Sequence, residues 1–202
     1  MDHKESIAQL IATVLDGTEL HFHVDSYRIE ENLESGPLTV QCNIHDERSG
    51  NRSVITGSGV GAIDAMFVGI VNVFANEFPS LKSLRVVDFS IKTDVNSGKQ
   101  ATRSDMAAIV TLIIANSEGR EYSFSHASQS TTHSSLAVVL QCTEFFINSE
   151  RAFISVYKAL QHARENNRPD SVTLYTSQLA TLVEATSYSE VIEQIRSTEL
   201  KK

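Results

Sequence analysis

The pattern of hydrophobic and polar residues changes its period early in the chain. Residues 5–15 carry apolar side chains at helical spacing, ahead of a stop signal at Gly17. Residues 20–29 and 38–45 then alternate between apolar and polar side chains, and residues 52–56 form a third, β-branched run. Such alternation is typical of antiparallel strands with one buried and one solvated face. We therefore expect one helix followed by three strands.

A second helix and a repeat of the same order are predicted further along. The helix ends at Pro79, and its apolar stripe comprises Ile63, Phe67, Ile70, Val71, Phe74 and Phe78. Strand-like runs at 84–93, 107–115 and 120–128 follow, and then a helix from about Ser134. Because residues 107–115 are apolar on both faces, we expect them to form a central, covered strand.

These elements predict an α+β protein with two βββα units, roughly 20–79 and 84–148, in which mainly antiparallel sheets pack against helices. We divide the chain into an N-terminal helix (1–18), the double βββα domain (19–148) and a C-terminal helical extension (149–202).

The C-terminal extension gives mixed signals. Residues 150–163 are amphipathic with a helical period, and residues 166–170 resemble a linker. Residues 171–182 fit a strand or a helix equally well. Ser187 and Glu190 have the spacing of a capping box ahead of a short helix.

Charge and composition exclude several classes of function. The net charge is −8 and the basic residues are scattered, which argues against nucleic-acid binding. No apolar run approaches the ~20 residues of a membrane span, and the first residues lack a secretory h-region, so we expect a cytoplasmic protein. Cys42 and Cys142 fit no metal or redox spacing and are expected to be buried hydrophobes.

The glycine-rich stretch SVITGSGVGAIDAM (53–66) resembles a nucleotide-binding turn. A dinucleotide fold needs G-x-G-x-x-G, whereas Gly57, Gly59 and Gly61 give G-x-G-x-G and position 62 is alanine. No Gly-Lys-Ser/Thr follows, so a P-loop is excluded. We interpret these residues as structural glycines at a turn from strand to helix, with nucleotide binding as the minor alternative.

Two polar clusters give weaker signals. His21 and His23 share a strand face with Asp25, and a neighbouring strand brings His45 near, so these groups could bind a divalent ion. An ordinary solvated strand face is the simpler interpretation, and we expect neither a metal nor a cofactor. In residues 125–135, hydroxyl groups and histidines precede a helix. They act either as helix N-caps or as part of a site where the helix start binds a ligand carboxylate. Neither cluster indicates a nucleophile, and we expect no enzymatic activity.

Four motifs in sequence order resemble the C-terminal regulatory (dimerisation) domain of α-isopropylmalate and citramalate synthases. They are ITGSGVGAIDAMFVGI, LRVVDFSI, RSDMAAIVTLII and YSFSHASQSTTHSSLAVVLQCTEFFIN, and they span about residues 20–148. Ala62 replaces the family's proline, Phe89 replaces a tyrosine, and the last loop lacks the family's glycines. The family's catalytic (β/α)₈ barrel takes ~250 residues, for which this chain has no room.

The resemblance implies a stand-alone regulatory module of leucine biosynthesis that forms a homodimer. It implies that a branched-chain amino acid or related acid binds near the dimer interface and that a separate catalytic synthase subunit responds. The ligand-binding positions carried over from the family are Gly59, Gly61, Asp64, Val86, Asp88, Phe89, Thr93, Asp105, Met106, Ala107, Ser128 and Thr131. The alternatives are a dimerisation or scaffold protein whose pocket no longer functions, and a small nucleotide- or metal-binding protein.

Overall fold

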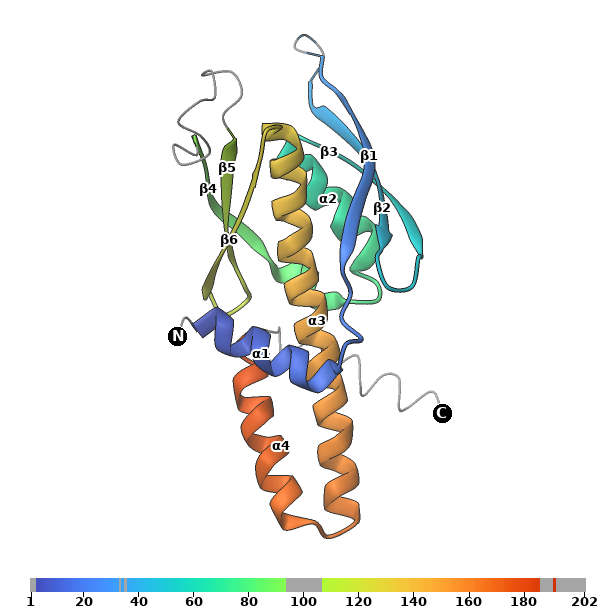
Figure 1. Cartoon of the computed structure of the whole chain (residues 1–202), viewed down its shortest axis with the longest axis vertical. Coiled ribbons are helices and arrows are strands. Elements are labelled where there is room, and N and C mark those ends of the chain that lie inside the picture. The colour runs from blue at the N-terminus through green and yellow to red at the C-terminus, as the bar shows by residue number, and fades with distance from the viewer. Residues whose placement is uncertain (1–2, 33, 35, 94–106, 186–190, 192–202) are drawn as a thin grey trace.

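Two three-stranded sheets, each followed by a helix, lie on either side of one long helix (Figure 1). The computed structural model describes residues 3–32, 34, 36–93, 107–185 and 191. The elements are α1 (His3–Leu15), β1 (Phe22–Glu30), β2 (Leu38–Asp46), β3 (Arg52–Gly59), α2 (Ala62–Phe74), the 3₁₀-helix η1 (Pro79–Ser83), β4 (Arg85–Thr93), β5 (Ala108–Ala115), β6 (Glu121–Ser128), α3 (Thr131–Glu165) and α4 (Pro169–Leu182). The predicted α+β class and the two βββα units are confirmed.

Both sheets are antiparallel, in the orders β1-β2-β3 and β4-β5-β6. Each first strand has an irregular register, between Val24 and Ser26 in β1 and between Val86 and Asp88 in β4. This topology lacks the parallel strands of a dinucleotide-binding fold among the described residues. Within the described part of the chain, none of the helices combines the length and apolar character that a bilayer span requires.

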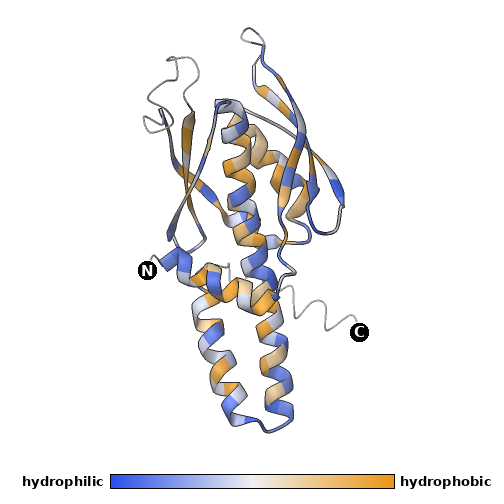
Figure 2. Ribbon diagram, in the orientation of Figure 1, coloured by the Kyte–Doolittle hydropathy of each residue, from blue (hydrophilic) through white to orange (hydrophobic). Residues whose placement is uncertain are grey.

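The core lies where the inner faces of the sheets meet the helices. Cys42 and Ile55 of the first sheet pack with α2, and Leu112 of β5 packs with α3. Figure 2 shows the hydrophobic positions gathered along α2, β5 and the neighbouring part of α3. Both cysteines are free and buried, as predicted, and burial followed by the nearby Asp25 charge raises the pKa of the Cys42 thiol to about 11.

Strand β5 is central, as predicted, but helices cover only one of its faces. Val110, Leu112 and Ile114 are fully buried, whereas the alternating residues Ile109 and Ile113 are only partly buried. Both faces of β5 are apolar, but only one of them is fully buried within one protomer. The other hydrophobic face of this sheet is partly open to solvent.

Helix α3 is longer than the sequence pattern indicated. It begins at Thr131 rather than near Ser134 and continues for 35 residues, so the expected boundary between 148 and 149 falls inside one helix. The unresolved choice for residues 171–182 is settled as helix α4, which begins at Pro169 and packs on α3. The proposed capping box at Ser187 and Glu190 lies outside the described residues.

The second predicted helix also ends earlier than expected. Helix α2 ends at Phe74, and Phe78 is buried beyond that end instead of continuing the helical stripe. Pro79 then opens the 3₁₀-helix, where its missing N–H and fixed φ are accommodated. Phe78 fits the helical spacing because it is buried in the same core, although it lies beyond the end of the helix.

Candidate functional site

The glycines of the β3–α2 turn serve close packing of backbone against backbone. A Cβ added to Gly57 would lie 2.5 Å from the backbone N of Gly69 in α2. One added to Gly59 would lie 2.7 Å from the backbone N of Ala65. Real Cβ atoms do not approach so closely, so both positions require glycine to bring β3 and α2 together. This supports the structural interpretation of the turn.

Gly61 differs from the other two glycines. It is the N-cap residue of α2, its φ of −160° is ordinary extended backbone, and an added Cβ would meet no atom within 4 Å. Because glycine has no side chain to accept hydrogen bonds from the first N–H groups of the helix, these groups stay available to another acceptor. The Asp64 carboxylate in the first turn accepts a hydrogen bond from the Val60 N–H at 3.0 Å.

A hollow of about 530 Å³ opens beside this helix start. The α2 start forms one side, strand β4 forms another, and Ser135 from the first turns of α3 completes the lining. Its apolar residues are Val60, Ala62, Ile63, Val86, Phe89 and Ile91. The volume lies within the range of small-molecule sites, and the few polar groups are Asp64, Ser135 and the backbone at Gly61.

Four of the residues expected to bind a ligand line this hollow: Gly61, Asp64, Val86 and Phe89. Sequence reasoning did not place Val60, Ala62, Ile63, Ile91 and Ser135 there. The signal for Ile91 was present, because it follows Phe89 at the period of two that puts strand residues on one face.

The structure does not bring Asp88 to the hollow. In β4, Val86 pairs with Ile114 and Phe89 with Leu112, whereas Asp88 pairs with Ile113 on the other face of the sheet. The irregular register at Val87 shifts the alternation by one residue, so Asp88 lies on the face opposite Val86.

The remaining expected positions lie elsewhere or cannot be placed. Gly59 lies beneath the α2 start and Thr93 lies at the far end of β4, paired with Ala108. Ala107 precedes β5, and Asp105 and Met106 lie outside the described residues. Ser128 and Thr131 flank the start of α3.

Hydroxyl groups organise the start of α3, as the N-cap interpretation predicted. Ser130 is the N-cap, and its Oγ accepts a hydrogen bond from the His133 N–H at 3.2 Å. The Ser128 and Ser134 hydroxyls lie 2.8 Å apart, and Ser134 is 3.3 Å from His126 Nδ1. Burial, and then the nearby His133, lower the pKa of His126. These hydroxyl groups stabilise the start of α3.

The histidines on the outer face of the first sheet lie as expected from their strands. His23 and His45 are cross-strand partners with ring centroids 5.2 Å apart, and His45 Nδ1 lies 2.7 Å from Asp25 Oδ1. Among the residues that the structure describes, however, no group of three or more His, Cys, Asp or Glu side chains is arranged to hold a metal ion. The cluster fits a solvated strand face with a local hydrogen bond between His45 and Asp25.

The paired βββα units, the glycine-packed turn and the apolar hollow define an α+β domain with a small-molecule-sized hollow beside a helix start. The sequence model of the LeuA allosteric (dimerisation) domain matches residues 3–147, and the chain belongs to that family. The match covers α1, both sheets and the first half of α3, and it confirms the resemblance drawn from the four motifs. No curated protein matches the chain. The domain of this family is a regulatory dimerisation module and not a catalytic one.

Proposed function

We propose that this domain binds a branched-chain amino acid, or a related small acid, in the hollow beside the α2 start. The observation that carries the proposal is the meeting of three features in one place: an apolar wall, an open helix N-terminus and a carboxylate. An amino acid carries a side chain, an anion and a cation, and each feature suits one of these groups.

The apolar wall suits a branched aliphatic side chain. Val86, Phe89 and Ile91 point from β4 toward the hollow, and Ile63 faces them from α2. Burying an aliphatic side chain of this size is worth about 1.5–3 kcal/mol. Among the described residues, those of β4 that line the wall are apolar, which favours leucine, isoleucine or valine.

The two charges of the amino acid have complementary partners at the α2 start. The first N–H groups after Gly61 carry the positive end of the helix dipole and suit the ligand carboxylate. Asp64 suits the ammonium group, because its carboxylate has acceptor capacity beyond the bond from Val60. A keto acid would keep the first interaction and lose the second.

We place the dimer contact at β4, next to the ligand. Val87 and Phe89 are 47% and 53% exposed, which is high for large apolar residues on a strand, and β4 is an edge strand with free pairing capacity. Phe89 belongs both to this exposed strand and to the hollow. A ligand beside Phe89 would therefore favour one arrangement of the two copies over another, and that difference is what couples binding to regulation.

The dimer would transmit the ligand's presence to a separate catalytic synthase subunit, as feedback control of leucine synthesis requires. A second candidate function is dimerisation or scaffolding without a ligand. It is favoured by the hydrogen bond that Asp64 already makes to Val60, which gives the carboxylate a structural role of its own.

Ligand-dependent melting separates the two candidates. A ligand at one hundred times its Kd adds about 2.7 kcal/mol to the free energy of unfolding. We expect leucine, isoleucine or valine to raise the melting midpoint and the matching keto acids to do so less. Unchanged melting with all of them, together with a dimer in sedimentation, would leave the scaffold as the function.

A further inference from the structure

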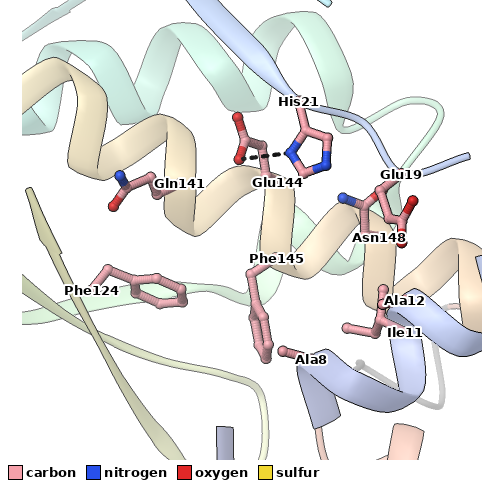
Figure 3. A pocket seen from close by; sticks show the side chains of 10 residues that line it. All are labelled: Ala8, Ile11, Ala12, Glu19, His21, Phe124, Gln141, Glu144, Phe145 and Asn148. Carbon is pink, nitrogen blue, oxygen red and sulfur yellow. Dashed lines mark ion pairs between the residues drawn. The ribbon is translucent and has the colours of Figure 1, made fainter. Parts of the chain in front are cut away.

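A second hollow, of about 410 Å³, lies where α1 crosses α3 (Figure 3). Its floor is aromatic: the rings of Phe124 and Phe145 lie edge to face with centroids 5.6 Å apart. Ala8 and Ala12 of α1 also line it, with Ala8 beside the Phe145 ring, and their small side chains leave the space open. This hollow shares no lining residue with the one beside α2.

A largely buried carboxylate, that of Glu144, lines this second hollow beside His21 (Figure 3). The Glu144 side chain is 18% exposed, its Oε1 accepts a hydrogen bond from the Phe22 N–H at 2.6 Å, and its Oε2 lies 3.9 Å from His21 Nδ1. Burial is the main cause that raises the pKa of Glu144 to about 7, and the acidic Glu47 and Asp46 add to it. The bond from Phe22 and the His21 ring act in the opposite direction.

The charge of the lining is one-sided. Of the described residues that line it, Glu19 and Glu144 carry carboxylates and none is a lysine or arginine. Lys4, the nearest cation on α1, is directed to the Phe124 ring at 4.5 Å and to the Ser123 carbonyl. A carboxylate held out of water without a full counter-charge gains most from a cation that brings its own apolar surface.

We propose that this second hollow binds a small organic ammonium ion with an apolar tail. The ammonium group meets Glu144, with Glu19 at the rim, and the tail lies on Phe124 and Phe145. Gln141 and Asn148 also line the site, but Asn148 is engaged by the backbone of Leu20, so it holds the wall and does not contact the ligand. The site is independent of the amino-acid hollow and stands whether or not that hollow is occupied.

The probe is 2-phenylethylammonium, and 2-phenylethanol is its neutral counterpart of the same shape. We expect calorimetric titration of the full chain at about pH 8 to show the ammonium binding at least tenfold more tightly than the alcohol. At about pH 6 the affinity should fall about tenfold, because nine-tenths of a carboxyl with a pKa near 7 is then protonated. Equal affinity for both probes, or no binding of the ammonium, overturns the proposal.

Two variants test separately the charge of the site and its open volume. Glu144→Gln keeps an acceptor for the Phe22 N–H and removes the charge, and we expect at least tenfold weaker ammonium binding. Ala12→Leu fills the hollow and leaves the carboxylate, and we expect the same loss. Circular dichroism verifies that both variants are folded, and a retained leucine response in both separates this site from the amino-acid hollow. Unchanged ammonium binding in either variant refutes the assignment.

Discussion

Gly57 in β3 lies in backbone contact with Gly69 in α2. A Cβ on Gly57 would lie 2.5 Å from the Gly69 N, and a Cβ on Gly69 would lie 3.0 Å from the carbonyl carbon of Thr56. Two glycines on facing elements thus set the separation of the first sheet from its helix. The turn is glycine-rich because two backbones meet there, and no phosphate is needed to account for it.

Gly57→Ala is expected to destabilise the protein by about 3 kcal/mol, since the new methyl group would overpack against α2 backbone that cannot move aside cheaply. Gly61→Ala in the same turn is the matched control. Its added Cβ meets no atom within 4 Å, and only the weaker capping preference of alanine costs stability, about 1 kcal/mol. Chemical denaturation of both variants measures the difference, and equal losses would contradict the packing argument.

Asp64→Asn is expected to weaken amino-acid binding at least tenfold, because the ammonium partner loses its charge while the amide oxygen still accepts from Val60. Titration calorimetry with leucine measures the effect. Asp88→Asn is the comparison, since Asp88 lies on the opposite face of β4 and its loss should leave binding unchanged. A larger effect at Asp88 than at Asp64 would mean that a partner copy brings that opposite face to the ligand.

Val87→Lys is expected to raise the dissociation constant of the dimer at least tenfold, because burying a lysine in an apolar contact is costly. Sedimentation velocity across a concentration series reports it. Val54→Lys is the control: Val54 is 52% exposed on β3, an edge strand of the other sheet, and should leave the dimer intact. If Val54→Lys dissociates the dimer and Val87→Lys does not, the contact lies on the first sheet.

The stability of the protein should fall as pH rises through the range set by Glu144. The folded pKa of about 7 lies above the ordinary glutamate pKa of 4.5, so the folded state binds this proton more tightly. The resulting stabilisation is present at low pH and is lost between about pH 4.5 and 7, with a size on the order of 1–3 kcal/mol.

Glu144→Gln removes this titration and keeps the hydrogen bond from Phe22. The difference in unfolding free energy between variant and parent should therefore shift in favour of the variant as pH increases from about 5 to 8. Taking the difference cancels the opposite trend of His126, whose lowered pKa makes stability fall on acidification. A difference that stays constant with pH would show that Glu144 titrates normally.

Alternation and helical period were enough to predict the order of strands and helices, because each sheet has one buried face. They could not reveal the irregularity at Val87. Val86 and Asp88 are two residues apart, so the sequence places them on one face of the strand. The structure shows an extra residue in β4 at Val87, and the two therefore lie on opposite faces. That single residue is the reason why Asp88 was expected beside Val86 and lies on the opposite face of β4.

The length of α3 escaped sequence reasoning for a different reason. Residues 148–150 are Asn, Ser and Glu, which resemble a polar break between two helices. All three are buried: the Asn148 amide bonds to the Leu20 backbone, and Glu150 accepts from the Ser80 N–H at 3.1 Å. Glu144 was missed for the same reason. Its sequence context is typical of a surface residue, and it is buried only because α1 and the segment before β1 pack beside it.

Helix α3 is a single rod of about 52 Å, given 35 residues at ~1.5 Å each. Ser135 lines the hollow beside the α2 start near one end of α3, and Glu144 lines the second hollow more than a third of the way along. The other end of α3 forms a hairpin with α4. A tilt of about 5° pivoting at the first end would displace the hairpin tip by about 4–5 Å. Any tilt of α3 at either hollow would therefore produce its largest displacement at the tip of the hairpin.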